Sequence, residues 1–120
     1  RMADALIRLL DRFDLADRVH LESQQTYMLT ALQVRRAGLK LFYYPPTFTE
    51  GLATAQQMDL YGLTIDVNKI TAEQIAEAHT HNLWVAVWNV QTKGENRDAI
   101  GMNPEIIQSD RIDHLVGLLD

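Results

Sequence analysis

Apolar positions along the chain switch repeatedly between helical spacing and the shorter pattern of a strand. Apolar residues recur at helical intervals in five segments, residues 2–13, 26–37, 50–61, 71–82 and 112–119. Short apolar or alternating runs, typical of strands, occupy residues 19–23, 39–44, 63–67, 83–90 and 105–109. Helical segments therefore alternate with strands from end to end, which predicts a layered α/β protein with parallel strands.

The region around the last strand is less regular. The connection at residues 91–102 is polar and only weakly helical, and we expect Gly94 and Gly101 to interrupt it. After the last strand, Ser109 or Asp110 is expected to cap the terminal helix, because both side chains can accept a hydrogen bond from a first-turn amide.

Two arrangements of these strands remain open. No pair of strands is joined by a hairpin signal, so neighbouring strands separated by a helix should be parallel. If strand order is sequential, right-handed crossovers place every helix on one side, and the chain is a sector of a β/α barrel. The alternative is an open, doubly wound sheet with helices on both faces.

Composition limits the function classes. The 120 residues, 47% hydrophobic and 22% charged, suit one globular domain. A net charge of -5 without a run of Lys or Arg argues against nucleic acid or an anionic membrane as partner. No apolar stretch approaches the length of a membrane span, so we expect a soluble protein. The lack of cysteine excludes a disulfide scaffold but leaves the compartment, cytoplasmic or exported, undetermined.

Candidate site residues lie at the carboxyl ends of the predicted strands, where parallel α/β sheets carry their active sites. Strand alternation predicts that His20 and Glu22 face the interior, and likewise Thr64 and Asp66. Trp88 ends an apolar strand and is either core packing or a pocket wall. Polar groups at such inward positions predict a water-accessible pocket.

Several functions of open α/β sheets lack their motifs. Residues 22–25 contain no glycine, so the dinucleotide-binding turn is missing. A phosphoacceptor receiver would need several charged residues at strand ends, and only Asp66 is near its position. Neither Ser23 nor Ser109 has the flanking glycines of a nucleophile elbow.

Other polar residues have plain structural explanations. Asp66 also fits a hydrogen-bonded carboxylate without catalytic role. His79 and His81 stand at a helix end, where an imidazolium suits the dipole, and His114 is expected at the surface. Tyr43 and Tyr44, before two prolines, either cover apolar surface or stack on a ligand.

Short motifs follow one another near the end of the chain. Trp-Asn-Val-Gln stands at residues 88–91, Gly-Met-Asn at 101–103, and Ile-Ile-Gln-Ser-Asp-Arg at 106–111. This series resembles the C-terminal signature of the glycerophosphodiester phosphodiesterase family, whose members show Trp-Thr-Val-Asn, Gly-Val-Asp, and Ile-Ile-Thr-Asp followed by Arg-Pro. Upstream, residues 19–24 are similar to a strand of the same family that ends in Ser-Phe.

The resemblance implies that residues 1–120 form the C-terminal part, about five β/α units, of a TIM-type barrel with parallel strands in sequential order. In that family two catalytic histidines, one in a His-Arg motif, and the carboxylate metal ligands lie on the first three strands. We therefore expect no catalytic residue and no metal ligand in this chain, with calcium or magnesium held elsewhere in the complete enzyme. The residues expected in the substrate pocket are Trp88, Glu22, Asn89 and Gln108.

The activity implied by the resemblance is hydrolysis of glycerophosphodiesters to an alcohol and glycerol 3-phosphate, as part of glycerol and lipid metabolism. The chain alone should be inactive, because the N-terminal strands that carry the catalytic motifs would precede it. Its expected partners are a small-molecule glycerophosphodiester and either the missing N-terminal half-barrel or a second copy of the chain. Two alternatives stay open: a self-contained five-stranded α/β binding or regulatory module without catalysis, and a degenerate half-barrel that self-associates.

Overall fold

The computed structural model describes residues 2–120, in which five parallel strands alternate with six α-helices. The strands are β1 (His20–Ser23), β2 (Lys40–Tyr43), β3 (Gly62–Asp66), β4 (Trp84–Val90) and β5 (Ile106–Ser109). The helices are α1 (Met2–Arg12), α2 (Thr26–Arg35), α3 (Phe48–Met58), α4 (Ala72–Thr80), α5 (Lys93–Gly101) and α6 (Ile112–Leu119), with a 3-10 turn η1 (Val67–Lys69) after β3. None of the helices within residues 2–120 combines the length and the apolar character that crossing a membrane requires.

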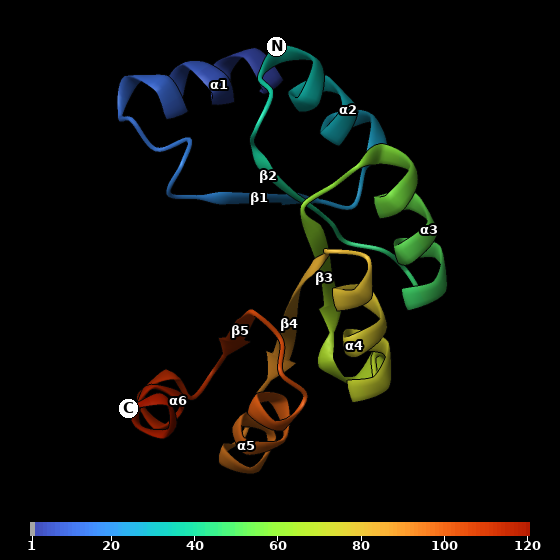
Figure 1. Cartoon of the computed structure of the whole chain (residues 1–120). Coiled ribbons are helices and arrows are strands. Elements are labelled where there is room, and N and C mark those ends of the chain that lie inside the picture. The colour runs from blue at the N-terminus through green and yellow to red at the C-terminus, as the bar shows by residue number, and fades with distance from the viewer. Residues whose placement is uncertain (1) are drawn as a thin grey trace.

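The strands lie in the order β1-β2-β3-β4-β5, and each is parallel to its neighbour. Figure 1 shows them on the inner side of a curve whose outer side carries the helices, with an opening between α1 and α6. A doubly wound sheet would need a non-sequential order and helices on both faces. The chain therefore forms a half-barrel, as the barrel interpretation predicts.

Register decides which side chains face the inside of the curve. Gly62 of β3 pairs with Phe42 of β2 and with Trp84 of β4, and Asp66 pairs with Trp88. Paired residues of a parallel ladder point to the same face. One inward row therefore joins Phe42 to Gly62 and Trp84, the first residues of β3 and β4, and another joins Asp66 and Trp88 toward the carboxyl ends of these two strands.

The hydrophobic core lies between the outer face of the sheet and the helices. Its central side chains are less than 2% exposed and come from strands and helices alike: Leu29, Leu63, Ile65, Ile75, Val85, Val87 and Val90. The inner face is less well covered, since the indole of Trp84 is 40% exposed there. Trp84 belongs to a row of aromatic side chains. The ring centroid of Tyr61 lies 5.0 Å from that of Trp84 and 5.9 Å from that of Phe42.

Two local predictions are wrong. The connection after β4 is a regular helix, α5, that contains Gly94 and Gly101, because the Thr92 hydroxyl caps it by accepting from the amide of Glu95. The buried residues of α5 are Asn96 and Ala99. Because Asn96 is polar, the regular spacing of apolar residues that would predict a helix is missing from the sequence.

The terminal helix also starts differently. Arg111 is the N-cap residue of α6 and makes no side-chain capping bond, so neither Ser109 nor Asp110 caps it. The Ser109 hydroxyl instead donates to Asn96 Oδ1 at 2.6 Å and accepts from the Arg111 amide at 3.0 Å. Ser109 therefore bonds to the buried side chain of Asn96 and does not cap α6.

Candidate functional site

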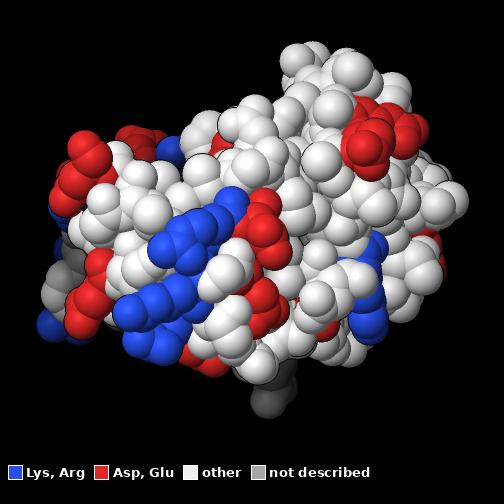
Figure 2. Space-filling view, turned by 90° about the horizontal axis from the view of Figure 1, so that it is seen from below, with Lys and Arg blue, Asp and Glu red and all other residues white. Residues whose placement is uncertain are grey.

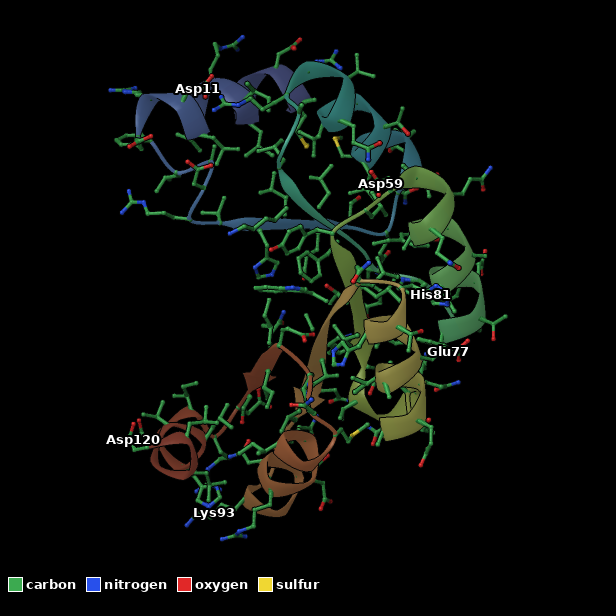
Figure 3. The ribbon with its side chains drawn as sticks, in the orientation of Figure 1. Asp11, Asp59, Glu77, His81, Lys93 and Asp120 are labelled. Carbon is green, nitrogen blue, oxygen red and sulfur yellow. The ribbon has the colours of Figure 1, made fainter. Side chains whose placement is uncertain are left out.

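The carboxyl ends of the strands place polar and aromatic side chains on the inner face of the half-barrel. In Figure 3 side chains from the strands reach into the space enclosed by the curve. The groups at this end are Glu22, Tyr44, Thr64, Asp66, Trp88, Asn89 and Gln108. They divide into two hydrogen-bonded groups joined by an aromatic pair.

The first group lies on β1 and β3. Thr64, 1% exposed, donates from Oγ1 to Glu22 Oε2 at 2.7 Å. His20 Nε2 lies 3.7 Å from the same carboxylate oxygen, so the imidazole also faces inward. The inward orientation predicted for His20, Glu22 and Thr64 is confirmed.

The second group links β3 to the end of β4. Asn89 Nδ2 donates to Asp66 Oδ2 at 3.2 Å, and Gln91 Nε2 donates to Asn89 Oδ1 at 2.6 Å. The other oxygen of Asp66 accepts from the amide of Asn68 at 2.9 Å. Asp66 is thus a hydrogen-bonded strand-end carboxylate that fixes the Asn89 side chain.

Asn89 sits in a β-bulge. Val87 pairs with Ile107 but Val90 pairs with Ser109, so β4 contains one residue more than β5 between these two pairs. Asn89 has φ 65, a left-handed conformation that asparagine tolerates better than most residues. The extra residue lets Trp88 face inward while Val90 returns to the outer face, where it is fully buried.

Trp88 packs against Tyr44 and also lines a hollow described below. Its ring lies 5.6 Å from that of Tyr44 at an interplanar angle of 50°, and it is half-buried. Its Nε1 is buried and has no hydrogen-bond partner within the described residues. A ligand on the inner face can therefore contact ring carbons of Trp88 but not its N–H.

Tyr44 belongs to the site although it was not among the four residues expected in the pocket. Burial raises the pKa of the Tyr44 phenol, and the carboxylates of Asp66 and Glu22 raise that pKa further. The hydroxyl therefore stays protonated and available as a donor at neutral pH. Strand alternation gives a signal for it, since Tyr44 shares the inward parity of Phe42 and directly follows β2.

A hollow of about 350 Å³ opens at the carboxyl ends of β4 and β5. Its lining residues are Trp88, Asn89, Gln91, Gln108, Ser109 and Asp110. Three residues expected to contact substrate, Trp88, Asn89 and Gln108, thus come together. Glu22 does not line the hollow and lies across the half-barrel on β1.

The histidines of α4 lie outside this site. His79 Nε2 is 2.8 Å from Glu105 Oε2, while Glu105 Oε1 accepts from the amide of Val85 at 2.8 Å. His81 Nδ1 is 3.0 Å from Gln56 Nε2. Over residues 2–120 no group of three or more His, Cys, Asp or Glu side chains is arranged to hold a metal ion.

Comparison with known proteins gives matches only at the level of structure. No protein-family model matches the chain, and no significant match was found among curated proteins. A protein from Galdieria sulphuraria, assigned as a glycerophosphodiester phosphodiesterase, superposes with a TM-score of 0.88 at 21% identity, covering 98% of this chain and 50% of its own. A glycerophosphodiester phosphodiesterase from Parabacteroides distasonis superposes with a TM-score of 0.83 at 15% identity, covering 98% and 49%.

A third solved structure agrees. The protein from Silicibacter pomeroyi, assigned as a glycerophosphoryl diester phosphodiesterase, gives a TM-score of 0.84 at 18% identity and covers 98% of this chain and 44% of its own. The chain thus spans about half the length of these solved proteins. Its fold is that of the C-terminal part of the glycerophosphodiester phosphodiesterase barrel, as the motifs at residues 88–111 indicate.

Proposed function

We propose that the chain is the C-terminal part of a metal-dependent glycerophosphodiester phosphodiesterase and supplies pocket wall and scaffold. The observation that carries this proposal is the half-barrel itself, five parallel strands in sequential order that superpose on about half of each of these phosphodiesterase structures. The motif resemblance at residues 88–111 supports the same family independently of the coordinates.

The reaction would transfer the phosphoryl group of a glycerophosphodiester to water. The water oxygen bonds to phosphorus, the bond from phosphorus to the alcohol oxygen breaks, and the alcohol leaves with a proton while glycerol 3-phosphate remains. A divalent cation, calcium or magnesium, would neutralise phosphate charge when bound. Its ligands and the proton-transferring groups are expected on the preceding strands, where the family resemblance places the catalytic motifs.

The residues of this chain would bind and orient the substrate. The exposed ring carbons of Trp88 suit the apolar face of a glycerol or alcohol group and exclude water from it. Gln108 and Asn89 carry amides that can donate to or accept from substrate hydroxyls. Glu22, half-exposed on β1, can accept a hydroxyl hydrogen bond from the other side of the barrel.

The expected protein partner is an N-terminal half-barrel. A closed β/α barrel has eight strands, so five strands leave room for three. A second copy would bring five strands and exceed that number. Three preceding strands would pair with the open edges of β1 and β5 and cover the exposed Trp84.

Enzyme assays on the 120-residue chain test the assignment. We expect no release of choline from sn-glycero-3-phosphocholine with added calcium or magnesium, and turnover above the buffer control would contradict the proposed division of roles. Light scattering provides the second measurement, since a stable dimer would favour the self-associating alternative.

The codons upstream of Arg1 test the same proposal directly. A His-Arg motif and a Glu-x-Asp motif on preceding strands would support it. An extended chain that binds glycerophosphodiesters without hydrolysing them would instead favour a binding module.

A further inference from the structure

A second cavity, of about 400 Å³, lies between the beginnings of α5 and α6, beyond the carboxyl ends of β4 and β5. Its lining residues are Lys93, Asp110, Arg111, Ile112, Asp113 and His114. It adjoins the hollow beside Trp88, because Asp110 lines both. Figure 3 shows Lys93 in the space between the two helices.

Lys93 and Arg111 line this cavity, and Arg97 lies beside it, with its Nη2 3.3 Å from Nε2 of the lining residue His114. We call Lys93, Arg97 and Arg111 the basic cluster. Lys93 and Arg97 are four residues apart on α5, Arg111 is the N-cap residue of α6, and all three charges lower the pKa of His114. Figure 2 shows basic side chains gathered next to one another on the face seen from below, with acidic ones beside them. Throughout the described part of the chain, no carboxylate oxygen lies within 4.0 Å of a nitrogen of the basic cluster. These cations are not held in direct ion pairs and so remain available to an anionic ligand, although Asp110 and Asp113 also line the cavity.

Acidic residues limit the size of that ligand. Asp110 and Asp113 line the cavity, and Glu95 and Asp98 lie on α5. An extended polyanion such as a nucleic acid backbone would meet these carboxylates as well as the cations. A small oxyanion can contact the cations alone.

Hydrogen bonds fix the tautomer of His114. Asn96 is completely buried, and its Nδ2 donates to the carbonyl of Arg111 at 3.1 Å while its Oδ1 accepts from Ser109. The same Nδ2 lies 3.0 Å from Nδ1 of His114, and because this buried amide is held by Arg111 and Ser109 we assign Nδ1 as its acceptor. In this assignment the neutral imidazole carries its proton on Nε2.

That Nε2 faces a second donor. Nη2 of Arg97 lies 3.3 Å from Nε2 of His114, and a guanidinium nitrogen has no lone pair to offer. Two N–H groups therefore meet at the cavity without an acceptor. Burial lowers the pKa of His114, and Arg97, Lys93 and Arg111 lower that pKa further, as expected for a ring surrounded by uncompensated cations.

We propose that this cavity binds a phosphate group, either inorganic phosphate or the phosphate of a monoester, on the basic cluster and on Nε2–H of His114. One phosphate oxygen would accept from both His114 and Arg97, and the others would face Lys93 and Arg111. Loops after the last two strands of β/α barrels frequently hold phosphate, which agrees with this position. The site is separate from the hollow where the diester is proposed to react.

The test is an imidazole titration followed by NMR. Proton–nitrogen correlation spectra of the protein are recorded at pH 7.5 and constant ionic strength, with inorganic phosphate or glycerol 3-phosphate replacing chloride. We expect a saturable shift of the His114 resonances and a higher pKa of His114 in phosphate than in chloride. Tighter binding of the monoester would identify a phosphorylated metabolite as the source, and equal binding would identify free phosphate. A shift that does not saturate with either anion would overturn the proposal.

Matched variants locate the site. Arg97→Gln and Lys93→Gln should each weaken phosphate binding about tenfold, since each removes a charged hydrogen bond. Lys69→Gln, on the 3-10 turn η1, removes a cation outside the basic cluster and should leave binding unchanged. Equal weakening in all three variants would contradict a defined site. Because these surface changes leave the core intact, and because the readout is His114, the result is independent of any hydrolytic activity.

Discussion

Glu22 accepts a 2.7 Å hydrogen bond from Thr64 although β2 lies between their strands. Strands two positions apart in a flat sheet are separated by roughly 10 Å. Side chains of that length can meet only if the sheet curves toward the face that carries them. This bond is therefore a direct indicator of barrel curvature, and it crosses above Phe42, which pairs with Glu22.

Thr64→Val tests the contribution of that bond. The variant keeps the side-chain shape but leaves Glu22 without its donor, and we expect a loss of about 1 kcal/mol in the free energy of unfolding. Thr30→Val is the control, because Thr30 is exposed on α2 and should stay within about 0.5 kcal/mol of the parent. Urea denaturation gives both values. Equal midpoints for the two variants would show that the bond contributes nothing.

Gly62→Ala tests the close approach at the amino end of the barrel. A Cβ at Gly62 would lie 2.5 Å from the carbonyl oxygen of Trp84 and 2.6 Å from the ring of Phe42. Since backbone must move to make room, we expect a destabilisation of about 1–3 kcal/mol. Gly117→Ala on α6 meets no atom within 4 Å and should stabilise by about 0.5–1 kcal/mol. Thermal melts of the two variants should shift in opposite directions.

Substitutions of Asn89 test whether the β-bulge holds this residue in a left-handed conformation. Asn89→Ala places at φ 65 a residue that tolerates the left-handed conformation less well than asparagine, at a cost of up to about 1–2 kcal/mol, and also removes the hydrogen bond to Asp66. Asn89→Gly loses the same side-chain bond without the backbone strain. We expect the alanine variant to be less stable than the glycine variant by about 1 kcal/mol in chemical denaturation. The reverse order would mean that Asn89 does not adopt the left-handed conformation.

Substitutions of Trp88 test the proposed pocket wall. They are made in a complete barrel that hydrolyses the diester. Trp88→Ala should raise KM about tenfold, because apolar contact with the substrate is lost. Trp88→Phe should raise KM less, since part of the ring surface remains. Trp84→Phe, at the amino end of the same strand, should leave KM unchanged. Steady-state kinetics give the KM of each variant. An equal rise in KM for the Trp84 variant would contradict a substrate contact specific to Trp88.

His114 makes stability depend on pH. The pKa of His114 is lower in the folded chain than in the unfolded chain. As pH falls through about 6.5, the unfolded chain is therefore protonated at His114 before the folded chain is. The free energy of unfolding should therefore decrease from pH 7.5 toward pH 5. His114→Gln removes this contribution and should flatten the curve relative to the parent. A parallel pH dependence of parent and variant would show that another group is responsible.

The periodicity of the chain was enough to predict the five strands and their inward faces, and the family motifs were enough to choose the barrel. It indicated only a weakly helical connection in place of the regular helix α5, because Asn96 takes the place of an apolar residue in the buried stripe. Its amide is satisfied by Ser109, Arg111 and His114, residues 13 to 18 positions later. For the same reason His114, expected at the surface, is half-buried.

The candidate site was also predicted only in part. Trp88, Asn89 and Gln108 were expected in the pocket from the family resemblance, and the pairing of β4 with β5 brings them side by side. The separation of Glu22 from the hollow depends on how far the sheet curves, which no local pattern encodes. The basic cluster was invisible for a related reason, since its cations come from a helix and a loop that meet only in the folded chain.

Sequential strand order has a consequence for how this protein is made. His20 pairs with Lys40 and Gly62 with Trp84, so each strand waits only for the next unit to be synthesised before it finds its neighbour. Pairing between successive units allows the sheet to grow one unit at a time on the ribosome. A nascent chain of this design adds each new strand to the edge left by the previous one, while the edge of β1 stays open until other strands pair with it.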